Sequence, residues 1–392
     1  MTALSRILVS AALVAVLPLT AIAQDKESVK IGLVSSKSGN FSSMGVDVIN
    51  AIRFAVDEAN ANGGVDGRQV LLAEGDDEST PDAGRRAAEK LARDGYNLLI
   101  GPIPSSISLA ISQNLSRWDA ALIGTMSKAD KLTMDACNPR FIRTNHSDAM
   151  DLAMIDQWVK TVPGNNFAIL AADYVWGQDS ARSFEAAVTS QGKKVALKLF
   201  APLGTKDYAP YIQQLKAANV DAIWVADVSG GIAFVKQAAD FGLTPKTPLV
   251  GHALVSNFII NATGTAMEGV PGNVGFTPDI DTPATKAFVE AFKAKHNRLP
   301  SDTEGQAYNG MMVLFDGIKL AGSVKPEAVT KALRGAQVET LYGKMTVRAD
   351  DNQLIIPNYV ARVKMSDGVL RPVIEQTFPE TIAPPASSVC KM

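Results

Sequence analysis

The chain has 392 residues, of which 38 are lysine or arginine and 40 are aspartate or glutamate, giving a formal net charge of −2. This balance lacks the strong positive charge that nucleic-acid binding depends on, so we predict no nucleic-acid partner. A chain of this length exceeds what one hydrophobic core usually supports, which favours two domains.

The first 23 residues have the pattern of a secretory signal peptide. Arg6 supplies the positive charge, an apolar run extends from Ile7 to Leu19, and Ala21-Ile22-Ala23 is a small-x-small cleavage site. The run is shorter than the roughly 20 apolar residues that a membrane-spanning helix requires. We therefore predict that residues 1–23 are removed on export and that the mature chain is soluble.

Strands and helices alternate in the first part of the mature chain. The predicted strands are short and apolar, and the predicted helices carry apolar residues at intervals of three and four. In chain order these elements are strand 29–34, helix 48–59, strand 70–73, helix 82–93, strand 98–100, a helix from Ser105 or Ser106 to Trp118, and strand 121–123. Such alternation predicts a doubly wound parallel sheet whose strands are buried on both faces.

A second alternating series follows Phe141-Ile142-Arg143-Thr144 and predicts a second α/β lobe. Its elements are helix 149–159, strand 167–171, helix 179–190, strand 195–200, helix 208–218, strand 222–225, helix 231–241 and strand 249–251. Three successive helices, 284–296, 303–321 and 326–333, break this pattern, so we place them on the first lobe. In the predicted strands 356–364 and 370–375 apolar and polar residues alternate and β-branched residues are frequent, as in antiparallel edge strands.

The two cysteines, Cys137 and Cys390, belong to a chain predicted to be exported, where disulfides persist. Either they form one bridge or they remain two unpaired thiols. Their spacing suggests neither a metal nor a redox site.

The sequence lacks the motifs of the common enzyme classes. It has no G-x-G-x-x-G after a strand, no Walker phosphate loop, no G-x-S-x-G elbow and no H-E-x-x-H. Its three histidines, His146, His252 and His296, are too scattered in sequence to propose a metal cluster. We therefore predict no enzyme activity, no cofactor and no metal.

Several segments together resemble one known family. They are 29–39 with the following helix, Asn62-Gly63-Gly64-Val65-Asp66-Gly67-Arg68, Ile100-Gly101-Pro102-Ile103-Pro104-Ser105-Ser106, Phe141-Ile142-Arg143-Thr144 with Ser147-Asp148, Asp173-Tyr174-Val175-Trp176-Gly177, and Asp207-Tyr208-Ala209-Pro210-Tyr211. Over nearly its whole mature length the chain resembles the periplasmic branched-chain amino acid (leucine/isoleucine/valine) type of ABC transporter substrate-binding protein, which has the type I periplasmic binding fold.

The resemblance implies two doubly wound, Rossmann-like lobes joined by a three-segment hinge. Lobe 1 would comprise residues 28–146 and 277–350, and lobe 2 would comprise 147–276 and 351–392 with the C-terminal tail. The crossings would lie near 145–148, 276–278 and 349–352. The resemblance further implies a periplasmic monomer that closes around a small-molecule ligand and delivers it to the membrane permease subunits of an ABC importer. The alternative is a periplasmic sensor that signals to a membrane receptor.

Candidate ligand-binding residues of lobe 1 follow its strands, because open α/β sheets bind ligands at the carboxyl ends of their strands. Ser105 and Ser106 open a helix after strand 98–100, where N–H groups and hydroxyls suit a carboxylate; an ordinary serine N-cap is the alternative. The resemblance adds Met126 and Ser127. Phe41 is either a ligand contact or a plain loop residue.

On lobe 2 the main candidate is Trp176, which the sequence places in a polar loop and which would lie flat on the ligand. The resemblance gives Asp148 a ligand-facing role, although it also suits an N-cap. Tyr308, in the predicted helix 303–321, is a further candidate for the wall of the ligand pocket.

One departure from the family bears on the ligand. Where leucine-type binders carry a glutamate for the ligand's ammonium, this chain has Gly251-His252-Ala253-Leu254, and we include His252 among the candidates. Because an unpaired buried ammonium is costly, either Asp227 or Asp148 replaces the glutamate, or the ligand lacks an α-amino group. The ligand therefore stays open between an amino acid and an organic or aromatic carboxylate.

Overall fold

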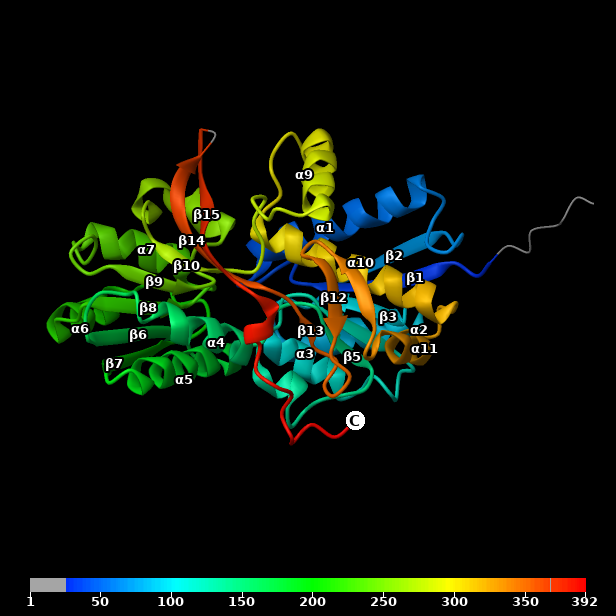
Figure 1. Ribbon diagram of the computed structural model, residues 1–392, viewed down its shortest axis with the longest axis horizontal. Helices are drawn as coiled ribbons and strands as arrows, with labels where there is room; N and C mark the ends of the chain where they lie inside the picture. The colour runs from blue at the N-terminus through cyan, green and yellow to red at the C-terminus, as the bar shows by residue number, and fades with distance from the viewer. Residues whose placement is uncertain (1–25, 367) are drawn as a thin grey trace, which may run out of the picture.

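The computed structural model describes residues 26–366 and 368–392, so the predicted signal peptide lies outside the described residues. These residues form two α/β lobes that lie side by side (Figure 1). Within the described ranges no helix is both long and apolar enough to cross a bilayer.

Lobe 1 is built on a five-stranded parallel sheet, as the alternating pattern predicted. Its order is β2-β1-β3-β4-β5, with bounds β1 (Val29–Ser35), β2 (Val70–Asp76), β3 (Leu98–Gly101), β4 (Ala121–Gly124) and β5 (Phe141–Arg143). Helices α2 (Pro81–Arg93) and α3 (Ser105–Ser112) share one apolar cluster with the sheet, and α1 (Ser42–Ala61) belongs to the cluster on its other face. A 3-10 turn, η1 (Asp130–Thr133), follows β4.

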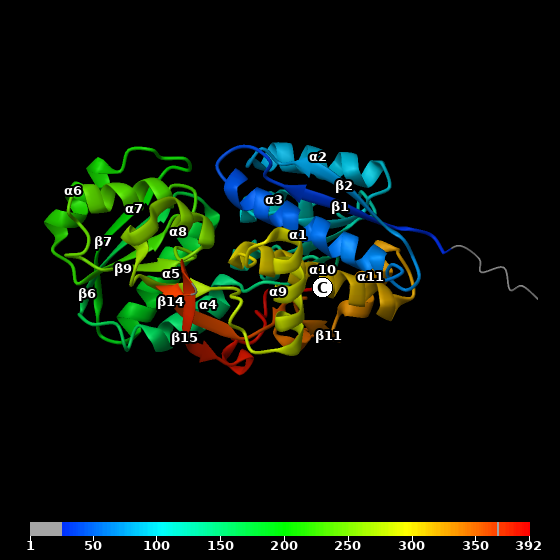
Figure 2. The same cartoon turned by 90° about the horizontal axis from the view of Figure 1, so that it is seen from above.

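Three later helices return to lobe 1, which confirms their predicted placement. They are α9 (Pro283–His296), α10 (Asp302–Ala321) and α11 (Pro326–Leu333), and α9 and α10 lie beside α1 (Figure 2). The ring of Phe54 on α1 packs 5.3 Å from that of Phe292 and 5.8 Å from that of Tyr308. This aromatic packing fixes the start of α10 against the first helix of the chain.

Lobe 2 has a seven-stranded sheet of order β15-β14-β10-β9-β8-β6-β7. Its strands are β6 (Asn166–Ala172), β7 (Lys194–Ala201), β8 (Ala222–Ala226), β9 (Leu249–His252), β10 (Pro271–Val274), β14 (Asn358–Ser366) and β15 (Val369–Phe378). The last two are antiparallel, as predicted from their alternating side chains. The helices are α4 (Asp148–Trp158), α5 (Val175–Ser190), α6 (Ala209–Ala218), α7 (Gly231–Asp240) and α8 (Asn257–Thr263), with η2 (Gly264–Met267) and η3 (Glu380–Ile382) as 3-10 turns.

A small antiparallel sheet that packs on lobe 1 was not predicted. It consists of β11 (Gln337–Thr340), β12 (Gly343–Val347) and β13 (Leu354–Ile355). Because Gln353 still bridges Arg143 and accepts its Nε–H at 2.6 Å, the third crossing comes after residue 355, later than the predicted 349–352. The buried guanidinium of Arg143 thus holds this segment on lobe 1.

Helix α5 begins four residues earlier than predicted. A Cβ on Gly177 would lie 2.0 Å from the carbonyl oxygen of Ala172, so only glycine lets the helix start directly after β6. Trp176 therefore lies in the first turn of α5 and not in a loop.

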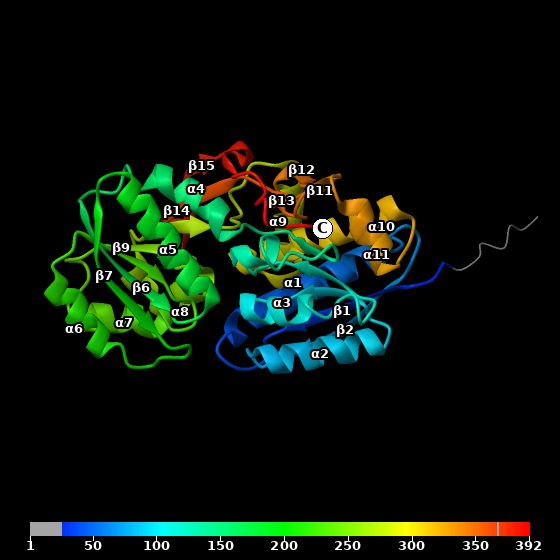
Figure 3. The ribbon, with the colours of Figure 1, turned by 90° about the horizontal axis from the view of Figure 1, so that it is seen from below.

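The C-terminal tail returns to lobe 1, although the prediction assigned residues 351–392 to lobe 2. A disulfide joins Cys390 to Cys137, which follows η1, and Arg348 donates a hydrogen bond to the carbonyl of Pro384 at 2.5 Å. Figure 3 shows the red tail running from β15 toward lobe 1. The tail is thus a further link between the lobes.

Removing this disulfide is expected to lower the free energy of unfolding. The bridge closes a loop with a sequence separation of 253 residues, and the chain-entropy model gives about 5.5 kcal/mol for so long a loop. Urea unfolding of Cys137→Ser/Cys390→Ser against the wild type measures the difference. Equal midpoints for the two proteins under oxidising conditions would contradict it.

Candidate functional site

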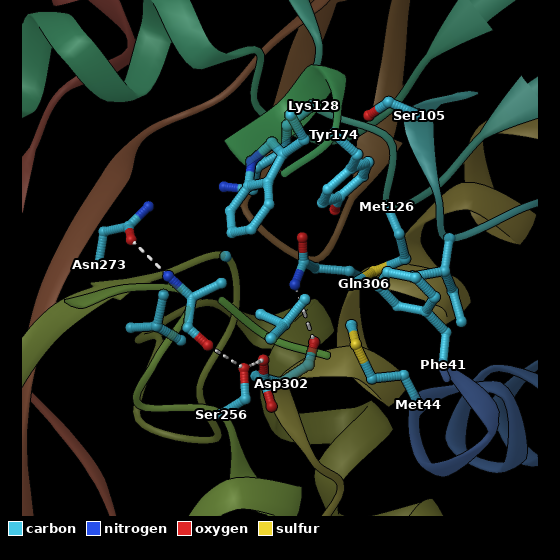
Figure 4. A pocket seen from close by; sticks show the side chains of 16 residues that line it. Phe41, Met44, Ser105, Met126, Lys128, Tyr174, Ser256, Asn273, Asp302 and Gln306 are labelled. Atoms are coloured by element: carbon cyan, nitrogen blue, oxygen red, sulfur yellow. Dashed lines mark hydrogen bonds between the residues drawn. The ribbon is translucent and has the colours of Figure 1, made fainter. Parts of the chain in front are cut away.

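A cavity between the lobes has residues from both as its walls (Figure 4). The empty space between its walls is about 530 Å³, which includes space open to solvent. Lobe 1 contributes Phe41, Met44, Ile103, Ser105, Met126, Lys128, Asp302 and Gln306, and lobe 2 contributes Tyr174, Trp176, Val228, Ala253, Ser256, Asn273 and Val274, with Gly275 following β10. Of the predicted residues, Phe41, Ser105, Met126 and Trp176 line this cavity.

Hydrogen-bond donors collect at the start of α3. The Oγ of Ser105 accepts a hydrogen bond from the backbone N–H of Ala129 at 3.1 Å, which leaves its own hydroxyl hydrogen free to donate. The first N–H groups of a helix have no acceptor within it. This end of the cavity therefore suits an anionic group.

Lys128 brings a buried ammonium to the same end of the cavity. It lies in the loop between β4 and η1, and its Nζ donates to Oδ2 of Asp151 on α4 at 2.6 Å, so this ion pair joins the two lobes. Burial pushes the pKa of Asp151 upward, but the charge of Lys128 and a hydrogen bond from His252 outweigh it and hold the pKa well below its usual range. Asp151 is therefore ionised, and an ammonium has three N–H donors, of which this bond uses one.

His252 ends β9 behind the cavity wall and does not line it. Its Nε2 lies 2.6 Å from Oδ2 of Asp151 and its Nδ1 lies 2.7 Å from the Oγ of Ser180. Burial lowers the pKa of His252, so the neutral ring donates from Nε2 to the carboxylate and accepts at Nδ1 from the serine. The ring supports Trp176, whose ring centroid is 5.0 Å away.

Asp148 is fully buried and neither of its carboxyl oxygens has a hydrogen-bond partner among the described residues. Burial, followed by the charges of Asp130 and Asp151, raises the pKa of Asp148 well above its usual value. The N-cap of α4 is Ser147, whose side chain accepts from the N–H of Met150 at 3.1 Å. Asp148 is thus neither the N-cap nor a residue of the cavity wall.

Asp148, Asp151 and His252 each offer a ligand atom, and these atoms lie within 4.8 Å of one another. Such a group can hold a metal ion. However, the Nζ of Lys128 is already 2.6 Å from Asp151, and its positive charge disfavours a second cation. We therefore interpret the group as the internal support of Lys128 and Trp176.

Three aromatic rings form one wall. The centroid of Tyr174 is 6.1 Å from that of Phe41 on lobe 1 and 6.0 Å from that of Trp176. Trp176 is only 4 % exposed, and its Nε1 has no hydrogen-bond partner in the described part of the chain. The wall therefore offers both flat apolar faces and one unpaired N–H donor.

The opposite wall is polar and comes from the start of α10 and the strand ends of lobe 2. Asp302 accepts hydrogen bonds from the Oγ of Ser256 at 3.0 Å and the N–H of Asn257 at 3.1 Å. Asn273 accepts from the N–H of Ala253 at 3.0 Å. Gln306 lies one turn further along α10, and its side chain reaches into the cavity (Figure 4).

Four other predicted residues also lie away from the cavity wall. Ser106 follows Ser105 on α3 but does not line the cavity, and Ser127 turns inward, where its Oγ lies 2.6 Å from that of Ser108. Asp227 accepts from the hydroxyl of Tyr208 and, at 2.8 Å, from the N–H of Gly230. It thereby holds the start of α7.

Tyr308 lies on the far side of α10, where its hydroxyl bonds to Glu58 and its ring stacks 4.2 Å from that of Phe288. Gln306, on the same helix, lines the cavity instead, since residues two apart on a helix differ by roughly 200° in direction. Lys128 directly follows the predicted Met126-Ser127 pair. The loop that contains these residues follows the end of β4, and this position was the signal that could have identified Lys128 as a residue of the cavity wall.

Two linked lobes with a polar and aromatic cavity between them define a protein that traps a small solute. The chain belongs to the periplasmic binding protein family, whose model matches residues 28–368. The predicted fold and the predicted type, a substrate-binding protein of an ABC transporter, are thereby confirmed.

The chain is 28 % identical over 324 residues to the Leu/Ile/Val-binding protein BraC3 of Rhizobium johnstonii, covering 81 % of this chain and 87 % of that protein. A solute-binding protein of an ABC transporter from Rhodopseudomonas palustris BisB5, solved with 3,4-dihydroxybenzoic acid, has a TM-score of 0.83 and 24 % identity, covering 90 % of this chain and 98 % of that one. Another from R. palustris, solved with benzoate, has a TM-score of 0.84 and 21 % identity, covering 93 % and 100 %.

Proposed function

We propose that the protein captures an aromatic monocarboxylate between its lobes in the periplasm and delivers it to the membrane permease subunits of an ABC importer. One observation carries this proposal: the cavity combines a buried ammonium and helix-start donors with a wall of three aromatic rings. A carboxylate fits the ammonium and the helix-start donors, and a flat ring fits the aromatic wall.

The carboxylate would bind where Ser105 and Lys128 meet. Both lie on the same side of the cavity in Figure 4, and both have hydrogens left to donate. Hydrogen bonds to a charged group are stronger than those between neutral groups, and they gain further strength where water is excluded.

An α-amino acid fits this cavity less well. Asp302 is the one carboxylate that lines the cavity within the described ranges, and both of its oxygens already accept hydrogen bonds. Asp148 and Asp227, the two predicted substitutes for the missing glutamate, do not line it. This supports the alternative in which the ligand lacks an α-amino group.

The relatives divide between the two ligand classes. The Rhizobium relative is named for leucine, isoleucine and valine, whereas the two Rhodopseudomonas proteins hold benzoate and a dihydroxybenzoate. The absent ammonium partner and the aromatic wall favour the second class. The two solved relatives are ABC transporter proteins, which supports import over the sensory alternative.

We further propose export by the signal peptide, action as a monomer, and binding without turnover. The signal-peptide pattern of residues 1–23 supports the first of these. The family role supports the last, since its members hold a solute and release it unchanged.

Titration calorimetry of the mature protein tests the ligand class. We expect heat on addition of benzoate or its ring-substituted relatives, and little heat with leucine, isoleucine or valine. Mass spectrometry of any small molecule released on denaturation provides a second measurement. Tight binding of leucine with no response to any aromatic acid would overturn the proposal.

A further inference from the structure

We infer that Gln306 selects ligands that carry a hydrogen-bond donor on the ring, so that the solute is a hydroxylated aromatic acid. This inference rests on the proposed function and assigns the polar wall opposite Lys128 a role in specificity. It concerns an acceptor within the cavity for which the described residues provide no partner.

The amide oxygen of Gln306 is an unpaired buried acceptor. The residue is 5 % exposed, and its Oε1 has no hydrogen-bond partner among the described residues. Its Nε2 donates to the backbone carbonyl of Asp302 at 3.3 Å. Because a carbonyl can only accept, this bond assigns the nitrogen to Asp302 and leaves the oxygen for the cavity.

Backbone packing holds the amide in place. A Cβ on Gly275 would lie 2.3 Å from the Cδ of Gln306 and 2.4 Å from its Oε1, so the amide lies directly on the backbone of this glycine. Gly275 directly follows β10, and its carbonyl accepts from the hydroxyl of Tyr342 at 2.6 Å. The acceptor is therefore positioned by a fixed surface of lobe 2.

A neutral amide oxygen matches a hydroxyl better than an ammonium. A single hydroxyl satisfies it, whereas an ammonium would bring three donors and a full charge that a neutral oxygen does not balance. Figure 4 shows the Gln306 amide extending into the space below Lys128 and Ser105. A ligand with its acid beside Lys128 and a ring hydroxyl beside Gln306 would satisfy both walls.

Binding sites that hydrogen-bond a ligand hydroxyl discriminate against analogues that lack it, because the buried partner is left unpaired. We therefore expect the wild type to bind 3- or 4-hydroxybenzoate about tenfold or more tightly than the fluorobenzoate with fluorine at the same position. Fluorine fills similar space without donating, so this ratio of dissociation constants isolates the hydrogen bond.

The test is calorimetry of Gln306→Met with the same ligand pairs. The variant keeps the length of the side chain and removes the acceptor, so the ratio of the two dissociation constants, for the hydroxy and the fluoro ligand, should fall to near one. Gln213→Met, on the exposed surface of α6, is the matched control and should keep the wild-type ratio.

Gly275→Ala provides a second variant, since its Cβ would displace the amide without changing its chemistry. As a single substitution it should reduce the hydroxy-to-fluoro ratio of affinities. Added to Gln306→Met, it should leave that ratio unchanged. A ratio that stays at the wild-type value in a folded Gln306→Met protein would overturn the inference while leaving the proposed function intact. Failure of all the aromatic acids to bind the wild type would instead overturn the proposed function.

Discussion

Substitution of Lys128 with methionine is expected to weaken benzoate binding by about thirtyfold or more. The ammonium is buried at one end of the cavity, and loss of one partner of a buried charge pair costs about 2–5 kcal/mol. Calorimetry with benzoate and benzamide measures the effect on two ligands of the same shape. The variant should lose the preference of the wild type for the carboxylate.

The same substitution also leaves Asp151 as an unpaired buried charge, which lowers stability. Lys128→Met/Asp151→Asn removes both charges, so it should recover much of the lost thermal stability without recovering benzoate binding. Lys331→Met, at an exposed position on α11, is the control for the substitution itself. A folded double variant with wild-type affinity would show that Lys128 does not contact the carboxylate.

Replacing Trp176 with alanine is expected to weaken ligand binding by about 1–3 kcal/mol, or roughly 5- to 150-fold. The indole is 4 % exposed and lines the cavity, so its loss removes apolar contact area and the unpaired Nε1–H donor. Calorimetry with benzoate measures the change in affinity. Thermal unfolding monitors the stability cost, because the ring also packs on His252.

Trp118→Ala is the matched control, since Trp118 packs under the guanidinium of Arg117 and does not line the cavity. It should leave the dissociation constant unchanged. If Trp176→Ala folds and binds benzoate as tightly as this control, the indole is not a ligand contact.

The fold was predictable where the elements are long and periodic. The buried strand at 98–101 and the amphipathic helix at 81–93 have clear patterns, and the three helices after residue 283 broke the alternation and so were assigned to lobe 1. Strands β11 to β13 are two to five residues long, which is too short for a period to appear. They pair with one another, and only the bridge from Gln353 to Arg143 depends on residues that are distant in sequence.

The site was predictable only in part, for a related reason. Strand ends indicate which loops face the cleft, and this identified Ser105; the family resemblance added Met126, and an aromatic ring in a predicted polar loop indicated Trp176. Which side chain of a helix turns inward depends on tertiary packing, and this separates Gln306 from the predicted Tyr308. The sequence does not distinguish a buried supporting role for His252 from a ligand contact. The hydrogen bonds that give it the supporting role come from Asp151 and Ser180, which are distant in sequence.

The returning C-terminal segment limits how far the cleft can open. Between Phe378 at the end of β15 and Cys390 the backbone can span at most roughly 40 Å when fully extended, and Arg348 already anchors Pro384 within that length. Ligand release must therefore proceed by rotations that this tether permits. Cleavage of the bridge by a thiol reductant would remove the covalent limit and widen the range of separations that the ligand-free protein samples.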